Sequence, residues 1–338
     1  MKAVGFKKSL PIEEENSFIE FETEKPKPGP RDILVKIKAI SVNPVDYKVR
    51  QGAAKDSELD EPKIIGWDAS GVVEEIGEKV SLFKKGDKVF YSGDVTRPGC
   101  YSEFQLVDER IAALKPENVD WQHAAALPLT ALTAWESIFD RIGIKENSGE
   151  GKNILIIGGA GGVGSIAIQL LKKLTKLKVI ATASREVTRN WCEKMGADDI
   201  VNHHDLLNNM KNYDHVDYIL NFADTSGNWE AMAELIAPQG AICCIVNNTE
   251  PVDLSILKNK SVSFHWELMF TRSQFETKDM KAQHKILERI KKLVEEHKIQ
   301  STMNKSFQGL TAETLKKVHK LQESGKSVGK NVISFENS

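Results

Sequence analysis

Cysteine is scarce in this chain, with four among 338 residues. Cys100 and Cys192 stand alone, while Cys243 and Cys244 are neighbours inside an apolar run. No two of them have the C-x-x-C spacing of a zinc site or a redox motif, and no disulfide framework can be built from them. This usage is typical of a protein that folds in a reducing compartment, so we expect a cytoplasmic location.

Long apolar runs and an excess of one charge are also lacking. No apolar run approaches the ~20 residues that a membrane-spanning helix needs. The N-terminus, MKAVGFKKSL, has no apolar core of the kind found in signal peptides. Lysine and arginine (46) nearly balance aspartate and glutamate (48), which leaves a net charge of −2. We therefore expect a small-molecule substrate, with neither nucleic acid nor a membrane as partner.

A glycine-rich stretch at residues 153–174 (NILIIGGAGGVGSIAIQLLKKL) is the strongest pattern in the chain. The apolar run 154–157 predicts a buried parallel strand, and apolar residues at helical spacing follow the glycines. Gly159, Gly161 and Gly164 have the G-x-G-x-x-G spacing of a dinucleotide-binding turn. Their expected roles are a tight turn, close approach of a pyrophosphate and close packing of the helix on the sheet. Gly162 and Val163, at the helix start, would offer backbone N–H groups to that anion.

The end of the next strand, at 179–183, indicates which dinucleotide binds. An NAD site has an acidic residue about 20 residues beyond the glycines, which binds the ribose 2′-hydroxyl. Here Ser184 and Arg185 stand there, with Arg189 one helical turn further. A hydroxyl and two guanidinium groups would hold a 2′-phosphate, so we predict NADPH as cofactor. The alternative is that both arginines simply solvate the start of a helix, and Glu186 could still serve a ribose hydroxyl.

Strands and helices alternate through the middle of the chain. After the glycine turn, the pattern predicts strands at 199–202, 216–222, 240–246 and 261–270, and helices at 187–195 and 228–237. Gly196 is expected to end the first of these helices in a left-handed conformation. This alternation predicts an α/β fold of the Rossmann type, with a doubly wound parallel sheet.

Ligands of such sheets bind at the carboxyl ends of the strands. Phe222, Ala223 and Val246 follow two of the predicted strands, so we expect them beside the cofactor. His203 and His204 resemble a metal pair, but adjacent residues of a strand point to opposite faces. We expect His203 to cover the adenine side of the cofactor instead.

Residues 1–125 have a different character. The stretches 33–39 and 101–107 alternate apolar and polar side chains, and 71–77 is typical of a strand that ends in a turn. Short strands between glycine or proline turns predict a small β-barrel or sandwich. The segment 281–297 is an amphipathic helix, and 326–335 returns to strand character. We expect the two ends of the chain to form one discontinuous β-rich domain.

Taken together, these segments resemble the medium-chain dehydrogenase/reductase superfamily, in its zinc-independent quinone oxidoreductase-like branch. The matching stretches are SVNPVDY at 41–47, GWDASGVV at 66–73, GDKV at 86–89, ALPLTALTAW at 126–135, the glycine stretch, and GKNV at 329–332. The resemblance covers nearly the whole chain. It implies a GroES-like catalytic domain from residues 1–125 and 273–338, a Rossmann domain from 126–272, and a homodimer.

The resemblance also poses the question of zinc. At the positions where zinc-dependent members place a cysteine, a histidine with a glutamate, and a second cysteine, this chain has Asn43, Trp67 with Asp68, and Leu129. The four-cysteine structural lobe is missing as well. One carboxylate does not make a catalytic zinc site, which needs three protein ligands. We therefore expect no metal.

By resemblance, Asn43 and Tyr47 lie beside the nicotinamide and are the candidate catalytic residues. Tyr47 could donate a hydrogen bond to a developing enolate, or it could be a packing aromatic; Asn43 could equally be a turn residue before Pro44. Thr133 is a candidate cofactor contact, or else a helix residue whose hydroxyl bonds backwards. Asn331 is expected to reach the cofactor from the other domain.

Three hypotheses for function follow. The first is an NADPH-dependent oxidoreductase that reduces quinones or α,β-unsaturated carbonyls without a metal. The second is a zinc-dependent alcohol dehydrogenase. The third is an NADPH-binding sensor or structural protein without turnover, which remains open because no strong general acid stands out.

Overall fold

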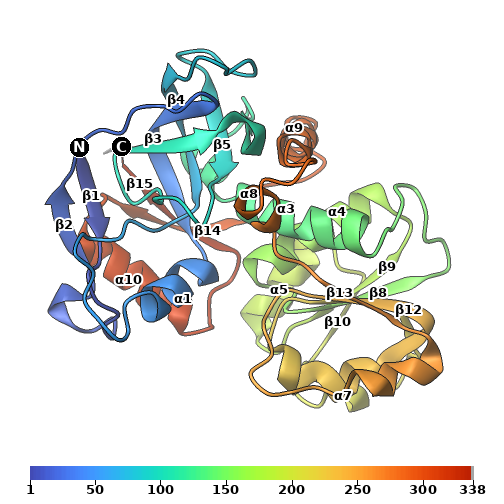
Figure 1. The fold of residues 1–338 in the computed structure, drawn as a ribbon. Coiled ribbons are helices and arrows are strands. Elements are labelled where there is room, and N and C mark those ends of the chain that lie inside the picture. The colour runs from blue at the N-terminus through green and yellow to red at the C-terminus, as the bar shows by residue number, and fades with distance from the viewer. Residues whose placement is uncertain (336–338) are drawn as a thin grey trace. The chain divides into compact units, whose positions relative to one another are not determined.

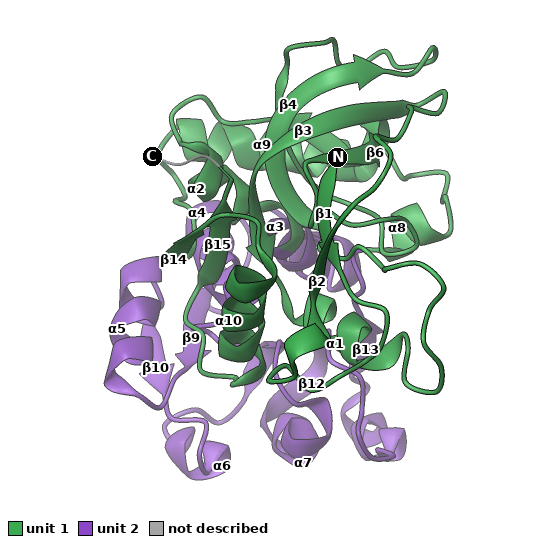
Figure 2. Ribbon diagram, turned by 90° about the vertical axis from the view of Figure 1, so that its left-hand side faces the viewer, with its two compact units in different colours: residues 1–129, 270–338 green, residues 130–269 purple. Residues whose placement is uncertain are grey.

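The computed structural model describes residues 1–335 and divides them into two compact units (Figures 1 and 2). Unit 1 contains Met1–Leu129 together with the chain from Phe270 onward, and unit 2 is Thr130–Met269. The chain thus leaves unit 1 once and returns to it once. The division lies within four residues of the boundaries expected at 125 and 273.

Unit 2 is built on a six-stranded sheet in which every neighbouring pair is parallel. Its strands are β8 (Asn153–Ile157), β9 (Lys178–Thr182), β10 (Asp199–Val201), β11 (Val216–Asn221), β12 (Ile236–Cys244) and β13 (Ser263–Trp266). Their spatial order is β10-β9-β8-β11-β12-β13. This is the order of the classic dinucleotide-binding fold, so the predicted doubly wound sheet is confirmed.

Helices connect these strands and bury their apolar faces on the sheet. They are α4 (Gly162–Leu174), α5 (Glu186–Met195), α6 (Leu206–Asn209) and α7 (Thr225–Leu235). Before the first of these strands lies α3 (Pro128–Trp135), which continues as a π-helix (Glu136–Arg141). As predicted, α5 ends at Gly196, whose φ of +103° is left-handed. In the core, the rings of Trp229 on α7 and Phe264 on β13 meet edge to face, with centroids 5.5 Å apart.

Unit 1 is β-rich, as the alternating stretches of residues 1–125 predict. Its main sheet contains β3 (Asp32–Val42), β4 (Asp68–Ile76), β5 (Lys88–Ser92), β6 (Phe104–Asp108), β7 (Ala112–Leu114), β14 (Met303–Gln308) and β15 (Lys330–Ser334). A separate hairpin pairs β1 (Lys2–Gly5) with β2 (Ile19–Glu22). The helices are α1 (Pro44–Gly52), α2 (Trp121–Ala125), α8 (Thr271–Gln274), α9 (Ala282–Glu295) and α10 (Ala312–Glu323).

The two ends of the chain meet within this sheet. Strand β15 pairs antiparallel with β3, so that Asn331 lies opposite Val42 and Val332 opposite Ser41. On its other side, β15 pairs parallel with β14. The start of β15 is therefore placed beside the end of β3, where α1 begins, and this brings residues about 290 positions apart into one polar cluster.

One predicted strand is longer than the observed one. The stretch 261–270 was expected to be extended throughout, whereas β13 covers only Ser263–Trp266. A short 3-10 helix (Leu254–Lys260) precedes it, and α8 begins just after it at Thr271. Within residues 1–335, no helix is long and apolar enough to cross a membrane.

Candidate functional site

The glycine turn between β8 and α4 forms an open helix start in unit 2. Gly158 has a φ of +85°, so the left-handed residue of the turn comes one position before the glycine expected to make it. Gly161 is the N-cap residue of α4, and no side chain caps the helix there. The first N–H groups of α4 are consequently not covered by a capping side chain, which leaves them suited to an anion.

Each glycine of the motif has its own steric surroundings. A Cβ at Gly164 would lie 2.3 Å from the carbonyl oxygen of Gly158, and one at Gly159 would lie 2.8 Å from the Cβ of Ala181. Both positions thus need glycine for packing. A Cβ at Gly161 would meet only the Gly158 oxygen, at 3.4 Å, so Gly161 faces space that a pyrophosphate could use.

The end of β9 lies directly behind this turn. The hydroxyl of Thr182, a residue that the sequence did not single out, accepts a 3.0 Å hydrogen bond from the Gly158 N–H. Ser184 is half-buried and Arg185, the N-cap residue of α5, is exposed. Arg189 donates to the carbonyl oxygen of Ile200 at 3.4 Å, which holds it against the neighbouring strand β10.

His203 joins this group electrostatically. Its side chain is exposed, and its pKa lies below the ordinary value because of partial burial, the adjacent His204 and the positive charge of Arg185. Ser184, Arg185 and Arg189 thus follow β9, whose last residue, Thr182, bonds to the glycine turn. Arg189 also contacts β10, the strand that precedes His203.

The ends of β11 and β12 supply the remaining predicted cofactor contacts of unit 2. The Phe222 N–H donates to the carbonyl oxygen of Ile157 at 3.0 Å, which places Phe222 beside the glycine turn. Ala223 follows it, half-buried. The Val246 carbonyl accepts a 2.6 Å hydrogen bond from the Thr225 hydroxyl. Thr133 is buried within α3.

In unit 1, the segment after β3 turns into α1 through a capping box. The Asn43 N–H donates to the carboxyl of Asp46 at 2.8 Å, and Pro44 occupies the first turn of the helix. This start of α1 presents Tyr47 half-buried. Within residues 1–335 the Tyr47 hydroxyl makes no hydrogen bond, and burial followed by the charge of Glu323 raises its pKa. Tyr47 thus keeps its proton and remains an available donor.

The side chain of Asn43, in contrast, is fully engaged. Its Nδ2 donates to the Ser41 carbonyl at 3.2 Å and to the Asp68 carboxylate at 3.1 Å, while its Oδ1 accepts from the Lys330 ammonium. Both amide hydrogens of Asn43 are therefore committed inside unit 1. A role for Asn43 in holding the start of α1 follows directly from these contacts.

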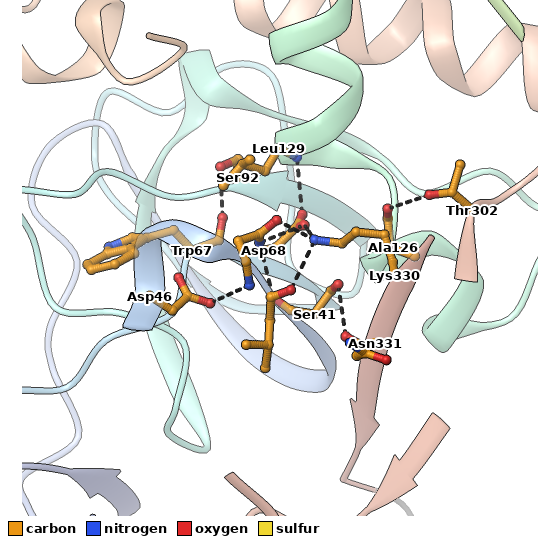
Figure 3. Close-up of polar contacts among 12 residues, drawn as sticks. Ser41, Asp46, Trp67, Asp68, Ser92, Ala126, Leu129, Thr302, Lys330 and Asn331 are labelled. Atoms are coloured by element: carbon orange, nitrogen blue, oxygen red, sulfur yellow. Dashed lines mark hydrogen bonds and ion pairs between the residues drawn. The ribbon is translucent and has the colours of Figure 1, made fainter. Parts of the chain in front are cut away.

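Lys330 and Asp68 form a buried ion pair (Figure 3). Asn43 makes hydrogen bonds to both residues. Lys330 Nζ lies 3.1 Å from Asp68 Oδ2, and the two residues are 3% and 0% exposed. The Leu129 N–H donates to the other oxygen of Asp68 at 3.2 Å. Burial raises the pKa of Asp68, and Lys330 is the main influence that opposes this rise.

The donor set of this cluster does not fit zinc. Among residues 1–335, no three histidine, cysteine, aspartate or glutamate side chains come together in a way that could hold a metal. Trp67 is buried and its indole N–H points to the Arg97 carbonyl at 3.4 Å, and Leu129 is apolar. Burial, and then Asp46, raise the pKa of the Cys100 thiol well above its usual range, so it is a poor thiolate ligand.

A second buried chain of polar groups begins at Asp46. The Tyr101 hydroxyl lies 3.0 Å from Asp46 Oδ2 and 2.9 Å from His319 Nε2, and all three side chains are buried. Burial raises the pKa of Asp46 to about 7, while burial lowers that of His319 well below its ordinary value. Sequence reasoning missed both partners, because neither stands near Asp46 in the chain.

Asn331 is placed in unit 1 at the start of β15 and is 2% exposed. Its Nδ2 donates to Gln322 Oε1 at 3.3 Å and to the Ser327 hydroxyl at 3.1 Å. Its carbonyl oxygen accepts from the Ser41 hydroxyl at 3.2 Å. These contacts bind the loop before β15 to the sheet, and they already use both amide hydrogens of Asn331.

Comparisons with known proteins agree with this architecture. Residues 29–117 match the alcohol dehydrogenase GroES-like domain, and residues 195–333 match the zinc-binding dehydrogenase domain. The chain is 46% identical to the zinc-type alcohol dehydrogenase-like protein of Staphylococcus aureus (strain COL), over 99% of this chain and 100% of that protein. The chain belongs to the medium-chain dehydrogenase/reductase superfamily. It is accordingly an oxidoreductase of that superfamily.

Two solved superfamily structures cover almost the entire chain. A Rhizobium etli CFN 42 protein assigned to the zinc-dependent alcohol dehydrogenases has a TM-score of 0.93 at 44% identity, covering 100% of this chain and 99% of its own. The quinone oxidoreductase of Coxiella burnetii has a TM-score of 0.83 at 28% identity, covering 99% of each chain. The Arabidopsis thaliana chloroplastic NADPH-dependent alkenal/one oxidoreductase is 40% identical over 46% of this chain and 40% of its own.

Proposed function

We propose that this chain is an NADPH-dependent reductase of quinones or α,β-unsaturated carbonyls that works without a metal. The observation that carries the cofactor choice is the end of β9, where Thr182 bonds to the glycine turn and Ser184, Arg185 and Arg189 follow in the chain. A 2′-phosphate would find two guanidinium groups there instead of a carboxylate. The NADPH dependence named for the Arabidopsis relative supports the same choice.

The substrate class follows from what the residues of unit 1 offer. Asn43, Trp67, Asp68 and Leu129 do not fit a Lewis-acid metal, so a simple ketone or alcohol would lack strong polarisation of its oxygen. In a conjugated carbonyl the charge spreads from the attacked carbon to the oxygen, and one or two hydrogen bonds suffice to stabilise it. The quinone oxidoreductase of Coxiella burnetii, with 28% identity, supports this class.

When bound, NADPH would supply a hydride. The residues of this chain would bind the cofactor, orient the substrate and provide the proton. Tyr47 is the proposed donor to the oxygen that becomes negative, because its hydroxyl keeps its proton and has no other partner within residues 1–335. The product of an enone needs one hydride and one proton.

Replacing Tyr47 by phenylalanine is expected to lower kcat more than it changes KM, which steady-state kinetics with an enone would show.

Nucleotide titration of the wild-type protein and of Arg185→Ala tests the cofactor choice. Loss of one or two charge-assisted hydrogen bonds should weaken NADPH binding by roughly 10- to 100-fold, with NADH affinity unchanged. Lys194→Ala, at the other end of α5, is the matched control and should change neither affinity. Equal affinity of the wild-type protein for NADH and NADPH would contradict the proposal.

A further inference from the structure

The Lys330 ammonium lies in a complete cage of oxygen atoms inside unit 1. Its acceptors are Asn43 Oδ1, Asp68 Oδ2 at 3.1 Å and the Val42 carbonyl at 3.4 Å. An ammonium has three N–H donors, and each finds one acceptor. The three oxygens come from the end of β3, the start of α1 and the start of β4, while the cation comes from β15.

The cage lies at positions that correspond to the zinc site of zinc-dependent superfamily members. Asn43 and Asp68 occupy two of the positions at which zinc-dependent members carry ligands, yet here both side chains bind the ammonium. The atoms that Asn43, Asp68 and Val42 turn toward the ammonium are all oxygens, whereas zinc in proteins is bound mainly by sulfur and nitrogen. The cage thus suits a singly charged, hydrogen-bonding cation better than zinc.

We propose that the Lys330 ammonium is a built-in cation that takes the place of the metal and holds the start of α1, with Tyr47, in position. In this view Lys330 is a positioning residue that acts through Asn43. Lys330 supplies the positive charge that offsets the buried Asp68 carboxylate, since an unpaired buried carboxylate is strongly disfavoured. This inference concerns unit 1 alone and does not rest on the proposed reaction.

Charge-paired substitutions test the cage without any activity measurement. Lys330→Met leaves the Asp68 carboxylate unpaired, and Asp68→Asn leaves the ammonium unpaired, so each should lower the Tm clearly. The double variant D68N/K330M is electrically neutral and should recover most of the lost Tm. A double variant as unstable as the worse single variant would show that the charges are not coupled, and would overturn the proposal.

Adding free cations to a variant with a truncated Lys330 side chain tests which cation the cage binds. Lys330→Ala removes the stem and the ammonium together, and n-propylammonium chloride should raise the Tm of this variant while leaving that of the wild type unchanged. Tetramethylammonium chloride, which has no N–H donor, is the control and should have no effect. Zinc chloride that stabilises K330A, or zinc at one per chain in the purified variant, would overturn the proposal and identify a latent metal site.

These outcomes are separable from those of the proposed function. Tm and metal content report on the cage, whereas the NADPH titrations report on residues of unit 2. If K330A does not fold, recovery of the fold in D68N/K330M still supports the cage. Failure of that double variant to fold, beside a folded wild type, contradicts it.

Discussion

Asp46 is a carboxyl held entirely inside unit 1, and within residues 1–335 its Oδ1 has no hydrogen-bond partner. Its other oxygen accepts from the Asn43 N–H and the Tyr101 hydroxyl. Lys330, whose charge acts on Asp46, is already paired with Asp68. Burial outweighs these favourable contacts, and the pKa of Asp46 rises to about 7.

This shift makes the stability of the protein depend on pH through Asp46. In the unfolded chain the carboxyl ionises near its ordinary pKa of 3.8, whereas in the folded chain it ionises near 7. Below pH 4 the carboxyl is protonated in both states, so it does not change the free energy of unfolding. As pH rises from 4 to 7, the folded state loses stability on the order of 4 kcal/mol, and the loss stays constant above that range.

Asp46→Asn should remove most of this dependence, since the amide resembles the protonated carboxyl in shape and charge. We expect its free energy of unfolding to fall less than that of the wild type between pH 4 and pH 8, as measured by urea unfolding at each pH. The exposed Asp56→Asn is the control and should follow the wild type. A wild-type stability that does not fall relative to D46N would contradict the raised pKa.

Contacts between individual side chains were the least predictable feature from the sequence. The glycine turn before α4 could be predicted because its geometry depends on near neighbours in the chain, whereas the role of Arg185 stays a prediction. The pairing of Lys330 with Asp68, and of Tyr101 with His319, could not, because these residues are more than 200 positions apart and meet only in the folded chain. Asn43 was singled out, but its full engagement in hydrogen bonds was not foreseen.

At the scale of elements, glycine in α4 and in the turn before it meets two different requirements, packing of the helix and approach of the ligand. The packing requirement lies at Gly164, where a Cβ would collide with the Gly158 backbone at 2.3 Å. The binding requirement lies at Gly161, where a Cβ would be tolerated by the protein itself at 3.4 Å. The motif therefore contains two glycines that the packing requires, Gly159 and Gly164, and one, Gly161, that we propose serves the ligand.

Paired alanine variants test this separation. Gly161→Ala should keep the Tm of the wild type within about 2 °C, since a tolerated surface change alters stability by ~0.5 kcal/mol. Its Cβ would stand where the pyrophosphate approaches, so NADPH affinity should fall at least about tenfold. Gly164→Ala should lower both the Tm and the affinity. A G161A variant with full affinity would place the pyrophosphate elsewhere.

Elements with strong periodicity were predictable, and weak ones were not. The strands of the parallel sheet and helix α5 appear where their apolar patterns predict them. Strand β14 (Met303–Gln308) was missed because none of its residues is fully buried, so its sequence, MNKSFQ, carries no clear alternation. Helix α10 was missed as well; one of its buried positions is His319, a polar residue that breaks the apolar stripe.

At the scale of the whole molecule, strand β13 is an open edge of the parallel sheet. Among residues 1–335 it pairs only with β12, and it exposes 47% of Trp266. Leu268, just beyond the strand, is 51% exposed. An unpaired strand edge with large apolar side chains is a surface that another chain can cover. We propose that a second copy of this chain covers it, giving a symmetric homodimer.

Trp266→Lys should break such a dimer by placing a charge at the strand edge. Light scattering after gel filtration should give twice 37.7 kDa for the wild type and 37.7 kDa for the variant. Phe275→Lys, which changes a 70% exposed residue outside β13, is the control and should stay dimeric. A monomeric wild type at all concentrations would contradict this assembly.

The connection of β15 to β3 also has a consequence for how the protein is made. Unit 2 is one continuous stretch, Thr130–Met269, so it can complete its sheet while the rest of the chain is still being translated. Unit 1 cannot, because Lys330, the one cation within residues 1–335 that pairs with the buried Asp68 carboxylate, comes from β15. The ribosome therefore delivers the neutralising charge after all of unit 2 has been made, and unit 1, whose first residues come earlier, is completed later than unit 2.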